Sequence, residues 1–406
     1  MAIQKGETLR KRDVKTMTRS TTRPLTTVRP QKSPKLEHKQ VRFHPNLPKH
    51  ERKSWTSIFN HSYVISVPLA SLFLYLFQHY LRFLDMDKRV YNHVPGECSF
   101  VGGLEKGAVD LAWLNNETVI ISTGSDLNNA SNATAGALSV WRVNDGMANE
   151  LSFSGKTPPT FNPYGISVFA STVFVINSRR GRVETDSVEV LEIKDGRLRR
   201  KRKPVASKHF TSLVNVVGLS STEFYASNQY IYRNPYMQWI EFGGHFKSGA
   251  VYYFDGRLIH PAIKKLKQPA GMARDGNKLY VAEFGGNAIQ IYDINDFKTP
   301  RHLETINLLS APFSIAMELR QSALTVSTHP LKLRFLAFQA YPEEFLSPSN
   351  VIRVKQRKNK TWQFTQFYCN DGATIRGVVT AMRIPDNRIV MGNVNRGLLK
   401  CQLNLT

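Results

Sequence analysis

The sequence is poor in cysteine and in acidic residues, and one stretch of it contains no charged residue at all. Three cysteines in 406 residues exclude a disulfide-dense scaffold, so the fold must depend on a hydrophobic core. The hydrophobic fraction of 41% is ordinary for a globular protein and supplies such a core. The 31 Asp and Glu residues face 55 Lys and Arg residues, which gives a formal net charge of +24. This excess indicates an anionic partner, either nucleic acid or a membrane surface.

The positive charge is concentrated at the N-terminus. Residues 1–60 contain fifteen Lys or Arg residues and four acidic ones. Residues 19–35 are rich in Pro, Thr and basic residues and poor in apolar ones, so we predict a disordered basic tail over residues 1–60. The next segment predicts a membrane tether. We therefore expect the membrane, and no nucleic acid, as the anionic partner.

The stretch from Ser54 to Leu81 lacks Lys, Arg, Asp and Glu. About 20 apolar residues, at roughly 1.5 Å each, cross a hydrocarbon core of about 30 Å. A buried core helix is the alternative, but such a helix normally shows a continuous polar stripe, which this stretch lacks. We predict a transmembrane signal anchor over residues 61–82 and a stalk over residues 83–97. No small-x-small cleavage site follows the apolar run, so the anchor should be retained.

The charges around the span predict its direction. Lys and Arg are abundant before it, which keeps the tail in the cytosol and makes the chain a single-pass, type II membrane protein. Residues 98–406 should then lie in the lumen or outside the cell, with the protein in the endoplasmic reticulum membrane, the plasma membrane or both. Five N-glycosylation sequons agree with this location, whereas the Asn60 triplet should stay unmodified. The five are Asn116, Asn129, Asn132, Asn359 and Asn404.

Two of the three cysteines stand near the two ends of the luminal part. A bridge between Cys98 and Cys401 would join these ends and, in the chain-entropy model, would stabilise the domain by about 4–5 kcal/mol. Three unrelated free thiols are the alternative, although an oxidising lumen favours the bridge. Cys369 would then remain as a buried free thiol.

Beyond Phe100 the sequence lacks long stretches of helical periodicity and shows paired apolar strands instead, about every 50 residues. Several pairs end in turn signals such as Asn144-Asp-Gly. Six such units predict an all-β fold, a six-bladed β-propeller over residues 98–406, closed by pairing of the last hairpin with the chain near Cys98. A β-sandwich is the alternative, but about 300 residues is long for one. The expected inner strands are 118–122, 172–176, 223–227, 278–282, 323–327 and 388–392, and the expected second strands are 137–142, 188–193, 250–254, 288–293 and 397–401.

The region from Cys98 to Leu403 resembles the paraoxonases, a family of calcium-dependent lactonases and arylesterases. The similarity is specific only when its segments are taken together. It implies a six-bladed propeller with two calcium ions in a central channel, and it implies a disulfide between Cys98 and Cys401. The matching segments are 102–111, 161–167, 223–228 with 234–238, 276–283 and 328–330.

The positions that would carry the chemistry of that family depart from its pattern. Calcium takes roughly six to eight oxygen ligands, and the side chains at the positions of the catalytic ion offer none. Without an ion nothing polarises a lactone carbonyl, and a phenol, with an ordinary pKa of about 10, is a poor base at neutral pH. We therefore expect no catalytic residues. The resemblance places the ion's ligands at Val109, Val214, Ala270, Pro312 and Phe313, and the two catalytic histidines at Tyr164 and Ser178.

A second, structural calcium ion remains open. Asp110 keeps a carboxylate and Asn215 a side-chain oxygen at family positions, so one weakly bound structural ion is the single cofactor to expect. The alternative is that Asp110 caps a turn. His329 matches a family histidine at the channel mouth and is expected to be structural rather than catalytic.

The combination of an N-terminal anchor and a paraoxonase-like domain resembles the nematode paraoxonase-like membrane proteins. That resemblance implies a non-catalytic chaperone or accessory subunit for membrane proteins such as degenerin-type sodium channels, acting in assembly, folding and surface delivery. A calcium-dependent lactonase or arylesterase is the first alternative, and a carrier with an apolar ligand in the channel is the second, against side chains that fill it. The lactonase would need replacement ligands, for which Asp126, Asp186, Glu241 and Asp275 are available.

Two further segments carry interaction signals. The aromatic-rich stretch 224–240 is a candidate contact face, with core packing as the alternative. The run 196–203 is the densest basic cluster of the luminal part, and we expect it on an exposed loop. That loop would stay solvated, or would meet acidic lipid, an acidic partner or a furin-type protease.

Overall fold

The computed structural model describes residues 55–124, 136–155, 158, 160–179, 185–319 and 321–404. Asn129, Asn132 and Asp126 lie outside these residues, as does the N-terminal tail up to residue 54. Two compact units divide the chain, Met1–Ser66 and Val67–Thr406. Helix α1, Trp55–Phe83, begins in the first unit and ends in the second. The predicted tail was therefore too long, because residues 55–60 are helical.

Helix α1 contains a stretch, Tyr63–Phe83, that is long and apolar enough to cross a membrane. Its side chains from residue 63 to residue 80 are exposed all around the helix, with Leu69 at 59% and Phe73 at 67%. A helix of a soluble core would bury one face of such side chains. The exposure therefore favours the membrane anchor over the buried core helix.

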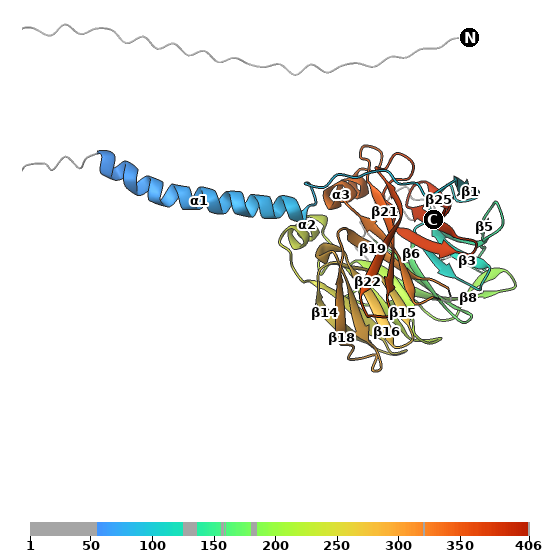
Figure 1. Ribbon diagram of the computed structural model, residues 1–406. Coiled ribbons are helices and arrows are strands. Elements are labelled where there is room, and N and C mark those ends of the chain that lie inside the picture. The colour runs from blue at the N-terminus through green and yellow to red at the C-terminus, as the bar shows by residue number, and fades with distance from the viewer. Residues whose placement is uncertain are drawn as a thin grey trace, which may run out of the picture. The chain divides into compact units, whose positions relative to one another are not determined.

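Six antiparallel sheets form the blades of a β-propeller, as Figure 1 shows, which confirms the predicted fold class. Blade 1 contains β2 (Asp110–Trp113), β3 (Thr118–Thr123), β4 (Ala137–Arg142) and β5 (Asn149–Glu150). Blade 2 contains β6 (Pro163–Phe169), β7 (Thr172–Asn177), β8 (Ser187–Lys194), β9 (Arg197–Arg200) and β10 (Val205–Ala206), and blade 3 contains β11 (Leu213–Gly218), β12 (Phe224–Asn228), β13 (Gly249–Phe254) and β14 (Ile259–Leu266). Blade 4 contains β15 (Pro269–Asp275), β16 (Lys278–Glu283), β17 (Ala288–Asp293) and β18 (Arg301–Asn307), and blade 5 contains β19 (Ala311–Met317), β20 (Ala323–His329), β21 (Ser349–Gln356) and β22 (Trp362–Asn370). Blade 6 contains β23 (Thr380–Ile384), β24 (Arg388–Asn393), β25 (Gly397–Gln402) and β1 (Cys98–Val101).

The innermost strands of the blades contact one another in a ring around the propeller axis; they are β2, β6, β11, β15, β19 and β23. Our expected inner strands exist, but each is the second strand of its blade, and the expected second strands are the third. The innermost strands escaped prediction because most contain a Gly or Pro, or a bulge, that breaks the alternation of apolar and polar residues.

The two ends of the domain close the ring in blade 6. Strand β1 pairs with β25, and the register places Cys98 opposite Cys401. These cysteines form a disulfide with a Cα–Cα distance of 4.1 Å. The predicted closure and disulfide are thus confirmed, and Cys369 is a buried free cysteine as expected.

Two short helices lie at one face of the propeller, because each connects the second strand of a blade to the third. Helix α2 (Pro235–Gly243) lies between β12 and β13, and α3 (Lys332–Ala340) lies between β20 and β21. Asn234 caps α2 by accepting the backbone N–H groups of Tyr236 and Met237, and Pro235 at the first helical position suits this start. We call this side the helical face and the opposite side the far face.

Candidate functional site

The innermost strands of four consecutive blades contain a bulge at an equivalent position near the strand start. A bulge re-aims the side chains within it, and bulges are frequent beside binding sites. The shifts in pairing fall between Pro163 and Ile166 in β6, Leu213 and Asn215 in β11, Pro269 and Met272 in β15, and Pro312 and Ser314 in β19. Between these residues lie Tyr164, Val214, Ala270 and Phe313, so the bulges coincide with predicted site positions.

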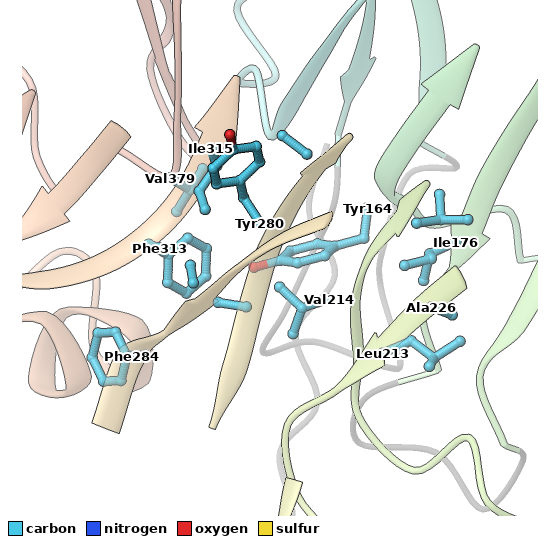
Figure 2. Packing of buried hydrophobic residues seen from close by; sticks show 14 of the residues in the cluster. Tyr164, Ile176, Leu213, Val214, Ala226, Tyr280, Phe284, Phe313, Ile315 and Val379 are labelled. Carbon is cyan, nitrogen blue, oxygen red and sulfur yellow. The ribbon is translucent and has the colours of Figure 1, made fainter. Parts of the chain in front are cut away.

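The side chains at these bulges fill the propeller axis with hydrocarbon. Val109, Tyr164, Val214, Ala270 and Phe313 are each at most 4% exposed and belong to one hydrophobic cluster, part of which Figure 2 shows. We call these five residues the axial plug. The backbones of neighbouring bulges approach closely where glycine follows a plug residue. A Cβ atom at position 165 would lie 2.4 Å from the carbonyl oxygen of residue 214, so this approach depends on the glycine there.

Two hollows lie on either side of the axial plug. One, of about 330 Å³, opens at the helical face between α2 and α3, and Phe313 forms part of its wall. The other, of about 520 Å³, opens at the far face and is lined by residues of the innermost strands, among them Asp110 and Asn215. The remaining plug residues line neither hollow. The predicted channel lining is therefore packed core at these five positions.

The residues at the axis do not fit a catalytic calcium ion. The plug side chains are hydrocarbon apart from the Tyr164 phenol. Backbone oxygens at the bulges already have partners, because Ser122 Oγ donates to Tyr164 O at 2.7 Å and Ser227 Oγ donates to Ala270 O at 2.6 Å. Within the part of the chain that the structure describes, no group of three or more His, Cys, Asp or Glu side chains could hold a metal ion. Calcium needs more oxygen atoms than this site provides.

Asp110 and Asn215 do come together, as the resemblance implied, but they bind each other. Asn215 Nδ2 donates to Asp110 Oδ2 at 3.1 Å, while Asn215 Oδ1 accepts the backbone N–H of Met272 at 3.0 Å. The Met272 N–H fixes the orientation of the amide, so Asn215 presents its NH₂ group and not its oxygen to the carboxylate. This arrangement does not fit the predicted structural calcium either.

The Asp110 carboxylate links several blades through hydrogen bonds. Oδ2 also accepts the N–H of Ile166 at 2.8 Å, and Oδ1 accepts the N–H of Leu111 at 2.9 Å and the Thr380 hydroxyl at 3.4 Å. Together with Asn215 it connects blades 1, 2, 3, 4 and 6 around the axis. Burial nevertheless raises the pKa of Asp110 to about 7, because the hydrogen bonds from Ile166 and the other donors only partly offset the loss of water. Near neutral pH the residue is therefore easily protonated.

The other family positions are structural. His329 is fully buried, its ring stacks on Phe335 at a centroid distance of 3.5 Å, and burial lowers its pKa to about 3, so it is neutral at pH 7. Ser178 is 2% exposed and follows β7, where its N–H donates to Asn162 O, and Pro312 is buried beside the plug. None of them provides a base next to an activated water.

Three acidic residues that could serve a lactonase as replacement calcium ligands are either hydrogen-bonded to backbone N–H groups or exposed. Asp186 accepts the N–H groups of Arg179 at 2.6 Å and Leu213 at 2.8 Å. Glu241 accepts two N–H groups in the segment that leads into α2. Asp275 is exposed at the end of β15. Replacement ligands for a catalytic ion are therefore not found among these three residues.

The glycosylation sequons in the described residues are accessible. Asn116, Asn359 and Asn404 are exposed, and Asn60 lies within α1. Exposure permits modification but does not test it, so glycosylation stays a prediction.

A buried charged site that the sequence did not predict lies where α1 ends. Asp85 and Lys332 are each 1% exposed, and Lys332 Nζ lies 3.3 Å from Asp85 Oδ2. Lys332 also donates to Asn287 Oδ1 at 2.9 Å and lies 4.8 Å from the centre of the Phe83 ring. No local signal predicts this pair, because its two members come from opposite ends of the chain.

Aromatic packing surrounds this ion pair. The Phe83 ring lies 3.7 Å from the His245 ring and 5.0 Å from the Phe242 ring of α2, measured between centroids. Leu84 is buried in the same hydrophobic cluster as the axial plug. We call Phe83, Leu84, Asp85 and Lys332 the anchor junction. It attaches the end of α1 to the helical face.

Comparisons with known proteins agree with the matching segments. The family model described as arylesterase matches residues 72–403. Mechanosensory abnormality protein 6 of Caenorhabditis elegans is 25% identical over 342 residues, which are 79% of this chain and 90% of that protein. Serum paraoxonase/arylesterase 1 of Mus musculus is 24% identical over 357 residues, and that of Homo sapiens is 24% identical over 359 residues; each match covers 84% of this chain and 99% of the relative.

Proposed function

Since the chain belongs to the arylesterase family, we propose that it is a non-catalytic member, a type II membrane protein that serves as a chaperone or accessory subunit for other membrane proteins. Degenerin-type sodium channels are the partners that we propose, in the endoplasmic reticulum membrane, the plasma membrane or both. One observation supports the loss of catalysis that we propose: apart from the Tyr164 phenol, the four bulges at these positions contain hydrocarbon side chains, and the amide of the neighbouring Asn215 is already hydrogen-bonded.

The relatives support the kind of partner. A protein named for mechanosensory abnormality is among the similar proteins, which points to a role in sensory cells rather than in the hydrolysis of esters. Helix α1 supplies a means of residing in the same membrane as a channel. A scaffold that has lost its reaction usually works through its surfaces.

An exposed apolar surface supports a protein partner at the helical face. Tyr236 is 80% exposed, Ile240 55% and Trp239 47%, and all three belong to α2. Large apolar side chains that are exposed together mark interaction sites. Phe83 at the end of α1 packs on α2. A partner protein whose chain emerges from the same membrane would therefore meet the α2 surface first. The stretch predicted as a contact face thus divides into buried strand β12 and this exposed helix.

Co-expression of the full-length chain with a degenerin-type channel subunit tests the proposal. We expect the chain to co-precipitate with the channel and to raise the amount of channel at the cell surface, measured by surface biotinylation. The double variant Tyr236→Ser with Ile240→Ser should lose most of this effect. A control, Leu303→Ser with Phe364→Ser, changes two apolar residues on β18 and β22 that are also exposed, at 43% and 49%, and should retain the effect. If channel amount and traffic are the same with and without the chain, the proposal is wrong.

The alternative, a calcium-dependent lactonase or arylesterase, is tested on the full-length chain in detergent. We expect no hydrolysis of a lactone or of phenyl acetate above the buffer rate, with or without calcium, while serum paraoxonase/arylesterase 1 serves as the positive control. Turnover that a chelator abolishes would establish the enzyme and reject the non-catalytic assignment.

A further inference from the structure

Part of the basic run 196–203 forms a strand, β9 (Arg197–Arg200), where a loop was expected, and residues 201–203 follow outside the strand. Strand β9 pairs with β8 after a tight turn in which Asp195 and Gly196 both have positive φ. A strand directs alternate side chains to opposite sides. The positive charges of this segment are therefore sorted into two sets with different surroundings.

The even-numbered residues of the segment contact the propeller, although the Arg200 side chain stays 39% exposed. Leu198 is fully buried. Arg200 forms an ion pair of 3.1 Å with Glu189, a carboxylate that is 2% exposed. Arg202 lies 4.9 Å from the centre of the Phe254 ring and donates to the carbonyl oxygen of Gly256. These contacts hold the segment extended across blades 2 and 3.

Four other cations of the segment, Arg197, Arg199, Lys201 and Lys203, are exposed. Arg197 and Arg199 are alternate residues of β9, roughly 7 Å apart, and Lys201 and Lys203 follow in the chain after the strand ends. Arg199 lies 3.9 Å from Glu192, and Lys201 donates to the uncharged Thr172 hydroxyl. Within the described residues, Arg197 and Lys203 form no ion pair. One carboxylate thus faces four cations, and we call these four residues the cationic row.

An added peptide strand is a poor occupant. The outer edge of β9 is already paired, because Leu198 N donates to Ser152 O and Ser154 N donates to Leu198 O. Recognition by strand addition needs a free edge, and it needs pockets for side chains. The outward side of this segment offers charges alone.

We infer that the cationic row binds a linear sulfated polysaccharide. Such a polymer presents repeated anionic groups and no strand edge, and arginine and lysine pair with oxyanions through charge-assisted hydrogen bonds. The inference takes from the proposed function the luminal or extracellular location of the propeller, but it does not depend on a channel partner. Attachment through the cationic row would leave the α2 surface free.

Heparin protection of lysine residues tests the inference on the unmodified full-length chain in detergent. Limited acetylation followed by mass spectrometry reads each lysine separately, so heparin bound to the basic N-terminal tail does not confuse the result. We expect heparin to protect Lys201 and Lys203 several-fold, and to leave Lys264 and Lys278, which are exposed on blades 3 and 4, unprotected. Equal protection of all four lysines, or of none, overturns the inference.

A pair of charge-reversal variants supplies the matched control. The double variant Arg197→Glu with Arg199→Glu should elute from immobilised heparin at a clearly lower salt concentration. The slope of log Kobs for heparin binding against the logarithm of the salt concentration should also become shallower, by the equivalent of about two ionic contacts. Lys264→Glu with Lys278→Glu makes the same change in net charge and should elute like the natural chain.

Two other anionic probes distinguish a polysaccharide ligand from an acidic protein and from lipid. A poly-glutamate peptide that protects Lys201 as well as heparin does would reassign the site to acidic protein, and protection by phosphatidylserine vesicles would reassign it to lipid. Either outcome overturns the polysaccharide inference. Both leave the proposed channel partner untouched, because that proposal rests on the α2 surface.

Discussion

The axial plug and the anchor junction bury opposite kinds of side chain. At the axis, where the family's chemistry would need oxygen ligands, the bulges contain Val, Ala and Phe side chains. At the junction, where helix α1 joins the propeller, Asp85 and Lys332 are each 1% exposed. Burial of a charge is costly unless it is paired and hydrogen-bonded, so charge is rarely retained inside without a purpose.

This difference indicates that the anchor junction, rather than the axis, selects one specific arrangement of side chains. Hydrocarbon at the axis contributes to the stability of the fold, because these side chains are packed core. A buried ion pair contributes little net stability compared with apolar side chains, but it penalises any other way of docking α1. We hypothesise that the junction fixes how the anchor meets the helical face, where the α2 surface is presented. The predictions below test the two halves of this comparison.

The largest expected effect concerns the plug itself. Phe313→Ala removes a ring that is 4% exposed and packs among Phe284, His329 and Phe335. We expect a loss of about 3–5 kcal/mol in the free energy of unfolding, measured by denaturant titration in detergent, because a cavity remains. Phe364→Ala, at a position 49% exposed, should cost about 0.5 kcal/mol or less. Similar costs for the two variants would contradict the view that the axis is packed core.

The next effect concerns the junction. Lys332→Ala leaves Asp85 buried with Lys88 as its remaining charged partner, and we expect a loss of about 3 kcal/mol. The double variant Asp85→Leu with Lys332→Leu should recover most of that loss, because no charge remains buried. Arg301→Ala breaks an ion pair whose arginine is 77% exposed and should cost about 1 kcal/mol or less. If breaking the Asp85–Lys332 pair costs as little free energy of unfolding as breaking the exposed Arg301 pair, the contrast between the junction and the axial plug is lost.

A pH-dependent effect, spread over the whole window between two pKa values, follows from Asp110, the polar group left beside the plug. Its folded-state pKa is about 7, whereas the unfolded chain titrates near 3.8, so the folded chain holds more protons between these values. The free energy of unfolding should therefore fall as pH rises through this window, by about 1.4 kcal/mol per pH unit from this residue, and level off above it. Asp110→Asn should abolish this dependence of the free energy of unfolding on pH, whatever the substitution costs in stability at any single pH. Parallel pH profiles for the two proteins would show that Asp110 does not titrate there.

Repetition made most of the fold predictable from the sequence. The second and third strands of each blade alternate regularly and end in turn signals, and blade 6 closes where Cys98 and Cys401 meet. The innermost strands were missed because bulges disturb their pattern. The loop expected at residues 196–203 was wrong for residues 197–200, because the Lys194-Asp-Gly turn leads directly into a short strand that pairs backwards onto β8.

The site was predictable only in part. The resemblance assigned these positions to one site, and the bulges gather four of them at the axis. The state of Asn215 was not predictable, since it depends on which atom of the amide faces the Met272 N–H, a backbone group of another blade. Nor could the Asp85–Lys332 pair be foreseen, because only the closed ring brings the two residues together.

The smallest expected effect is the response to calcium. A ligand that binds the folded chain alone raises its stability by RT ln(1 + [L]/Kd), so a calcium concentration 100 times the Kd would add about 2.7 kcal/mol. Because Asn215 turns its NH₂ group toward Asp110, we expect a millimolar excess of calcium and an excess of chelator to give the same thermal midpoint within error. Serum paraoxonase/arylesterase 1 is the control for the method. A calcium-dependent rise in the thermal midpoint that Asp110→Asn abolishes would mean that the Asn215 amide can flip and that calcium can bind. The axis would then differ from the family's site only at the positions of the catalytic ion.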